Sequence, residues 1–178
     1  MMRFEFSLAA LRRDQRGVSA LEFALIAPLL IAFYFGMSEM AQAFMAQKRT
    51  GHVAATVADL AAQDDVITAA ELSNIFAAGQ IIMQPYPVAE LDQRLSSVTV
   101  DSRGVARVDW SRGVGMAPRT VASTVDLPTG LAANGQSIIY SEVSYAYQSP
   151  IGAFLPDATT FRRGYYLRPR LVEKVLLA

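Results

Sequence analysis

One long apolar run constrains this chain more than any other feature of its sequence. Between Gly17 and Ser38 the only charged residue is Glu22. As an α-helix this run would extend about 33 Å, enough to cross a bilayer core of about 30 Å. We therefore expect a transmembrane segment over residues 18–38.

A short charged segment, residues 1–17, precedes the run. It holds four arginines against two acids, a net charge of +2, whereas the rest of the chain carries −2. Basic residues before a membrane segment favour the cytoplasm, so we expect the following domain outside. A secretory signal peptide has a shorter apolar region, of about 7–15 residues, and a cleavage site after it. We see no such site here and interpret the run as an anchor.

The helix is expected to continue beyond the membrane. Residues 39–63 are rich in the helix formers Ala, Met and Gln, which predicts a helical stalk ending at about Gln63. An apolar stripe supports part of this helix: Met37, Met40, Ala41 and Phe44.

Composition argues against several classes of function. The chain contains no cysteine, which excludes disulfides, thiolate nucleophiles and cysteine zinc sites. His52 is the only histidine, so no His-based metal pair is possible, and we expect it to be a solvated stalk residue. A net charge of +0 gives no case for nucleic acid. With no catalytic motif in the sequence, we expect no enzyme activity, no cofactor and no metal.

Residues 64–178 are expected to form an α+β head domain. The helical pattern breaks at Asp64–Asp65, which we interpret as a solvated turn rather than a cation site. Thr68 followed by Glu71 is a capping box, which predicts a second helix to about Met83, before two prolines.

A period of two then predicts an antiparallel sheet packed against the helices. Strands are expected within residues 96–101 and 104–111, joined by a hairpin at 101–104, and within residues 119–128, 137–150 and 161–170. Trp110 is expected in the core. A basic group near the end could touch acidic partners or nucleic acid, but we interpret it as a solvated strand: Arg162, Arg163, Arg168 and Arg170.

Glu22 and Pro28 are unusual within the apolar run. A carboxylate deep in a bilayer costs a few kcal/mol and suggests a function and a partner. Alternatively, Glu22 lies near the interface and reaches headgroup water. Proline is tolerated in membrane helices where neighbours satisfy the freed carbonyl.

The spacing around Glu22 resembles a prepilin peptidase site. In "RGVSALEF" the cleavage-site glycine is Gly17, the first mature residue would be Val18, and Glu22 would be the fifth. The longer stretch "RRDQRGVSALEFALIAPLLIAFYFGMSEMAQ", with Gly36 and Glu39 near its end, resembles the TadE-like minor pseudopilins of tight-adherence (Flp) pili. "VDSRGVARVDWSR" and "RPR" match the pattern more loosely.

That resemblance implies a function. A non-catalytic minor pseudopilin would be cleaved between Gly17 and Val18, and Glu22 would meet the new α-amine of a neighbouring subunit and set axial register. The implied partners are the prepilin peptidase, other pilins and minor pseudopilins, the inner-membrane assembly platform and the lipid bilayer. The implied location is the bacterial inner membrane, with the head in the periplasm. The alternative is an uncleaved signal-anchored periplasmic accessory or binding protein, which the state of the Gly17–Val18 bond distinguishes.

Overall fold

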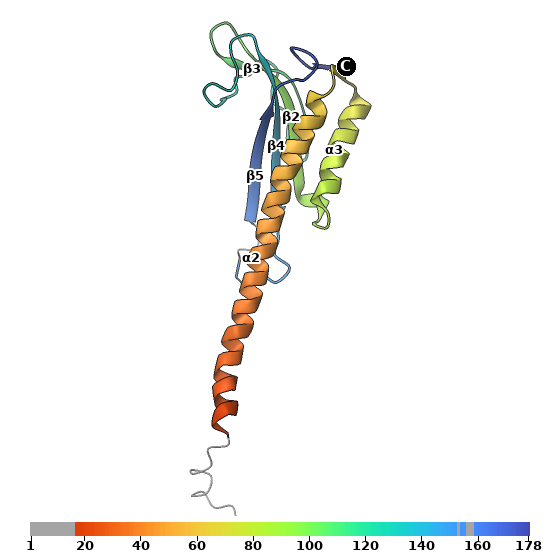
Figure 1. The fold of residues 1–178 in the computed structure, drawn as a ribbon. Coiled ribbons are helices and arrows are strands. Elements are labelled where there is room, and N and C mark those ends of the chain that lie inside the picture. The colour runs from red at the N-terminus through yellow and green to blue at the C-terminus, as the bar shows by residue number, and fades with distance from the viewer. Residues whose placement is uncertain (1–16, 153, 156–158) are drawn as a thin grey trace, which may run out of the picture.

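The computed structural model describes residues 17–152, 154–155 and 159–178. Residues 1–17, which the resemblance makes a prepilin-type leader, therefore lie outside the described residues, apart from Gly17. The predicted α+β fold is confirmed: a long N-terminal helix, a second helix and a four-stranded antiparallel sheet (Figure 1).

The N-terminal helix α2 runs without interruption from Val18 to Ala62, with Pro28 inside it and Gln63 as its C-cap. This end agrees with the predicted one. Figure 1 shows the first half of α2 extending away from the head as a single rod, while the second half lies among the other elements.

The second half of α2 packs into the head through a face of mostly small side chains. This half, expected from sequence as a helical stalk, contacts α3, β4 and β5. Small side chains let the helix axis approach the sheet closely, which larger residues would prevent. The buried residues of α2 are Glu39, Ala43, Ala46, Thr50, Val53, Ala54, Val57, Ala58, Ala61 and Ala62.

The second helix, α3, spans Ala69–Met83 and begins at the predicted capping box. The Thr68 hydroxyl accepts a hydrogen bond from the Glu71 N–H at 3.3 Å, and the Glu71 carboxylate accepts one from the Thr68 N–H at 2.8 Å. These bonds satisfy two of the N–H groups that a helix start leaves open. Gly79 lets α3 approach the sheet, because a Cβ there would overlap the Gln93 side chain.

The main sheet has the strand order β3-β2-β4-β5, with every neighbouring pair antiparallel. Its strands are β2 (Leu91–Val100), β3 (Ala106–Val114), β4 (Ser137–Tyr147) and β5 (Thr159–Leu167). β1 (Val66–Ile67) and β6 (Leu176–Leu177) form a small parallel pair, and η1 (Val88–Glu90) leads into β2. The predicted hairpin joins β2 to β3 through a turn that closes with Gly104 N–H donating to the Asp101 carbonyl.

One predicted strand is wrong. Residues 119–128 form turns and irregular chain that meet β3 through a single bridge, Arg107 to Thr124. Ala122 has φ of 64°, which breaks the extended conformation in the middle of the run. Val125 is nevertheless buried, in a small cluster with side chains of β2 and β3. The alternating pattern at residues 119–128 therefore belongs to a loop that packs against the sheet, not to a strand.

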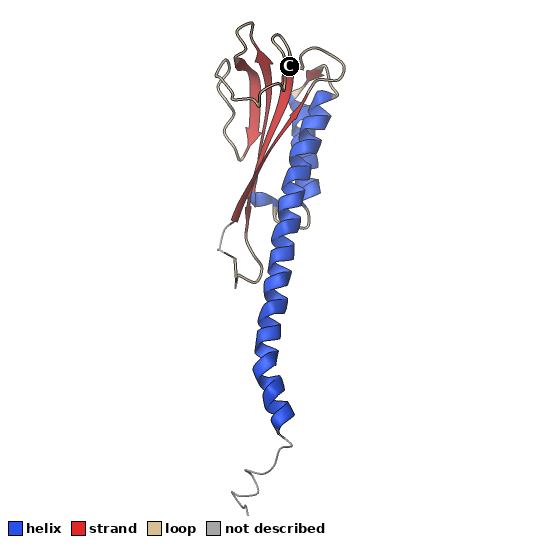
Figure 2. Ribbon diagram, turned by 60° about the vertical axis from the view of Figure 1, so that its left-hand side comes forward, coloured by secondary structure: helices blue, strands red, loops and turns tan. Residues whose placement is uncertain are grey.

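The main core lies between one face of the sheet and the two helices (Figure 2). Trp110 belongs to it, as predicted, and its indole N–H donates to the Val175 carbonyl at 2.9 Å. Pairing of Leu91 with Tyr145 places the start of β2 beside the end of β4. This end of the sheet points toward the first half of α2, and the 101–104 turn lies at the opposite end.

Candidate membrane and assembly interface

The predicted cleavage site lies where the long helix begins. Gly17 is the N-cap and Val18 the first helical residue; the Leu21 N–H donates to the Gly17 carbonyl at 3.0 Å. Gly17, Val18 and Glu22 are all exposed. Because Val18 and Glu22 are four residues apart, they lie on one face of the helix, about 6 Å apart along its axis.

The first half of α2 presents apolar side chains on all sides. Among the described residues, α2 is the only helix long and apolar enough to cross a membrane, and the window that meets this criterion has no buried residue. A helix that is hydrophobic all round needs an apolar environment. The large exposed apolar residues of this half are Val18, Leu21, Phe23, Leu25, Ile26, Leu29, Leu30, Ile31, Phe33, Tyr34, Phe35 and Met37.

The apolar stripe noted in the sequence is not part of the buried face of α2. Met37, Met40, Ala41 and Phe44 are exposed, while Glu39 and Ala43 begin the buried face of α2. The stripe therefore carries the exposed apolar surface of the helix beyond Ser38, up to the base of the head.

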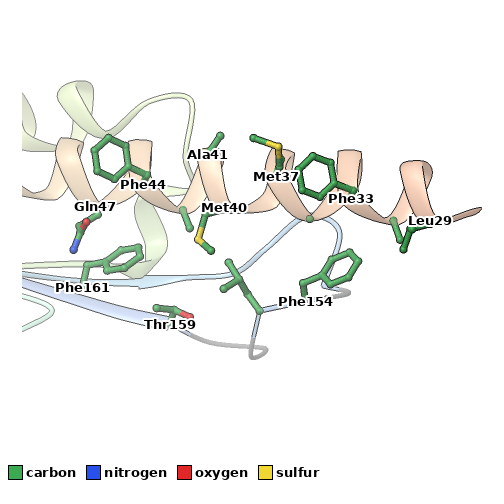
Figure 3. Close-up of a pocket in the computed structure, with 14 residues that line it drawn as sticks. Leu29, Phe33, Met37, Met40, Ala41, Phe44, Gln47, Phe154, Thr159 and Phe161 are labelled. Atoms are coloured by element: carbon green, nitrogen blue, oxygen red, sulfur yellow. The ribbon is translucent and has the colours of Figure 1, made fainter. Parts of the chain in front are cut away.

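A groove of about 930 Å³ adjoins this stripe. In Figure 3 one wall is α2, from Leu29 to Gln47, and the other comes from Phe154, Thr159 and Phe161. Its lining is almost entirely apolar. The groove thus spans the point where the apolar run ends and the head begins.

Glu39 is the first acid after the apolar run and is completely buried. Its carboxylate accepts hydrogen bonds from the backbone N–H groups of Phe154, at 3.0 Å, and Leu155, at 3.3 Å. A hydrogen bond from the Ser149 hydroxyl, followed by these backbone bonds, lowers the pKa of Glu39 below its ordinary value of 4.5. Glu39 therefore ties the loop between β4 and β5 to the helix.

Sequence reasoning placed Glu39 in a family pattern but missed this role. Its partners lie about 115 residues away, so no local spacing reveals them. The available signal is the position itself, since an acid at the end of an apolar run needs either water or hydrogen-bond donors.

A second charged group lies on the sheet face away from the helices. Glu142 on β4 accepts paired hydrogen bonds from Arg94, at 2.7 and 2.7 Å, and from Arg119, at 2.9 and 2.7 Å. Burial acts to raise the pKa of Glu142, but the two guanidinium groups hold it below its ordinary value. Beside this group Tyr140 stacks on Tyr166, with ring centroids 4.4 Å apart. Arg119 thereby fastens the irregular 115–128 segment to the sheet.

The four arginines considered as one basic group are dispersed. Arg162 and Arg163 are neighbours in a strand and project to opposite faces of β5. Arg168 donates to the Leu131 carbonyl at 3.0 Å, and Arg170 pairs with Asp59 of α2. Two of the four thus serve contacts within the head.

Other candidates from the sequence occupy unremarkable positions. His52 is exposed on α2, and Asp64–Asp65 form the break between α2 and β1. Within the described ranges, no group of three or more histidine or acidic residues is arranged to hold a metal ion.

The fold and these surfaces define a class: an α+β head built onto one long helix whose first half could span a membrane. The family model described as TadE-like protein matches residues 17–59, which confirms the resemblance seen in the sequence. The match links the chain to pilus-related membrane proteins of Tad systems. No curated protein and no solved structure matches the chain significantly.

Proposed function

We propose that this chain is a non-catalytic minor pseudopilin that takes part in assembling a tight-adherence (Flp) pilus. In this proposal a prepilin peptidase cleaves between Gly17 and Val18, and residues 18–38 anchor the mature chain in the inner membrane. The N-terminus is cytoplasmic and the head periplasmic. Its partners are other pilins and the assembly platform of the membrane.

One observation carries the proposal: the family match begins at Gly17 and covers the anchor, Glu22, Glu39 and most of α2. Most of the large exposed apolar side chains among the described residues lie on the matched helix. An anchor whose outer face is open suits a subunit that packs through its N-terminal helix.

Glu22 has a specific role in the proposed assembly. Cleavage would leave a charged α-amine on Val18, one turn before Glu22 on the same helix face. In a bundle, that amine can pair with Glu22 of the adjacent subunit, which offsets the cost of holding a carboxylate in an apolar seam.

The exposed stripe at Met37, Met40, Ala41 and Phe44 extends the packing surface. Its spacing of three and four residues forms one apolar ridge, the pattern by which helices pack against each other. A neighbouring helix seated there would continue the contacts of the membrane segment into the periplasm.

The decisive test is the N-terminal residue of the protein recovered from membranes. Intact mass in a strain with active prepilin peptidase should show a chain that begins at Val18, and a strain without the peptidase should retain the leader. Gly17→Leu should block cleavage, whereas Gly17→Ala should be partly tolerated because Ala is nearly as small. Full-length chain alone, with active peptidase present, would instead support the uncleaved accessory protein.

A further inference from the structure

The loop between β4 and β5 reaches down the long helix to the level of the membrane segment. The Phe154 ring lies 3.7 Å from the position that a Cβ on Gly36 would take. Gly36 lies inside the apolar run, about 27 Å along the helix axis from Val18. Since a bilayer core is about 30 Å thick, Phe154 lies level with its outer boundary if Val18 lies at the inner one.

This loop presents apolar side chains to its surroundings at that level. Ile151 is 37% exposed and Phe154 is 56% exposed. Phe154 also lines the groove beside α2 (Figure 3), so its ring extends the apolar surface of the helix sideways. In water the apolar side chains of Ile151 and Phe154 would be in contact with solvent, which is unfavourable.

Four backbone N–H groups of the loop have hydrogen-bond partners within the protein. Irregular chain is tolerated at membrane depth only when its N–H and C=O groups find partners within the protein. The N–H groups of Phe154 and Leu155 donate to the carboxylate of Glu39, which is itself fully buried. The N–H groups of Ile151 and Gly152 donate to the Ser149 hydroxyl, each at 3.3 Å.

We propose that residues 149–152 and 154–155, the membrane loop, form a second contact with the lipid bilayer. The loop rests in the headgroup region of the leaflet from which α2 emerges, with Ile151 and Phe154 against the acyl-chain boundary. The head then touches the membrane at two places, the helix and the loop. This inference rests on the anchoring of residues 18–38 in the proposed function.

Lipid is the favoured occupant because of continuity with α2. At the level of Gly36 the exposed face of α2 belongs to the proposed anchor, and a membrane anchor is surrounded by lipid acyl chains. The sheet end that carries the loop, where β4 ends at Tyr147 and β5 begins at Thr159, points toward the first half of α2 (Figure 1). A neighbouring subunit is the alternative occupant, and the test separates the two.

Single cysteines can test the contact cleanly because the chain contains no cysteine. A nitroxide label is placed at Ile151→Cys and, separately, at Phe154→Cys, in the full chain reconstituted in phosphatidylethanolamine–phosphatidylglycerol vesicles. Power saturation compares the access of oxygen, which partitions into lipid, with that of a water-soluble nickel complex. Two control labels bracket the result: Phe33→Cys in the anchor and Val121→Cys in the head.

Val121 is a matched control because it is exposed and distant from the anchor. The neighbouring Ala122 N–H bonds to the Val108 carbonyl, and Val108 pairs with Val98, near the sheet end opposite the membrane loop. The proposal expects labels at 151 and 154 to favour oxygen over nickel several-fold more than the label at 121, at a depth shallower than that at 33.

Three outcomes would overturn the proposal. If labels at 151 and 154 match the label at 121 while the label at 33 lies in lipid, the loop is outside the bilayer and anchoring stands. If the label at 33 is also accessible to the nickel complex, residues 18–38 do not lie in the bilayer and the proposed anchoring is contradicted. If labels at 151 and 154 are shielded from both reagents, and dilution with lipid reverses this, a second protein copy covers the loop.

Discussion

Glu22 and Glu39 are carboxylates at opposite ends of one apolar run, and their surroundings differ. Glu22 is exposed on a bare helix, whereas Glu39 is enclosed by hydrogen-bond donors of a loop. A carboxylate with donors nearby is satisfied within one chain. A carboxylate without them needs water or a partner from outside. We therefore expect Glu39 to matter to the folded subunit and Glu22 to the assembly.

Replacing Glu39 with Gln should loosen the membrane loop in a way that depends on pH. The pKa of Glu39 is lowered by folding, so its stabilising effect is present above its ordinary value of 4.5 and is lost as pH falls through the lower, folded pKa. Glu39→Gln should therefore lower Tm at pH 7, and the difference from wild type should narrow below pH 4.5. Thermal unfolding in detergent across this range measures it. Glu173→Gln, at an exposed site, is the control and should show no such convergence.

Replacing Glu22 with Gln should spare insertion and cleavage but impair assembly. Gln is nearly the same size and is cheaper to place in a bilayer, so abundance and the Val18 terminus should be normal. An unpaired partner amine would weaken the bundle, and breaking a buried ion pair costs about 3–5 kcal/mol. Crosslinking to other pilins and surface piliation should fall sharply, and Glu22→Asp should restore part of both. Wild-type piliation in Glu22→Gln would favour a carboxylate that only reaches headgroup water.

At the scale of elements, sequence patterns predicted correctly those features that are set by hydrogen bonds between residues close in the chain. The capping box at Thr68 and Glu71 gave the start of α3, and the 101–104 turn gave the hairpin, because the hydrogen bonds involved join residues close in sequence. The 119–128 run was misread, since a positive φ at Ala122 is invisible in an alternating pattern. The buried face of α2 was also missed. Its small residues recur at helical spacing, but the larger side chains of the outward stripe dominate the pattern.

The Arg94–Glu142–Arg119 group should stabilise the head more than an ordinary surface pair. Glu142→Gln leaves two partly buried guanidinium groups facing each other, so the free energy of unfolding should fall by about 1–3 kcal/mol. The matched control is Arg107→Gln, which breaks the more exposed pair with Asp101 and should cost less than about 1 kcal/mol. Chemical denaturation of the purified protein measures both. Equal losses would mean that Glu142 contributes no more than a surface charge.

At the scale of the whole molecule, one continuous helix joins the segment that could span a membrane to the core of the head. Because α2 contains both, displacement of its first half along the axis would be transmitted to the head without a flexible joint. Glu39 and the membrane loop lie at the junction.

In the proposed function the head and the N-terminus lie on opposite sides of the membrane. The net charge of +2 in residues 1–17 should hold the N-terminus in the cytoplasm, because basic residues next to a membrane segment resist translocation. A reporter fused after Ala178 should then be active only in the periplasm. Changing Arg12, Arg13 and Arg16 to Gln should lower the fraction with this orientation, while the same change at Arg103 and Arg107, in the head, should have no effect. Cytoplasmic reporter activity in the unaltered fusion would contradict the proposed topology, and with it the pairing of a membrane-embedded Glu22 with a Val18 amine.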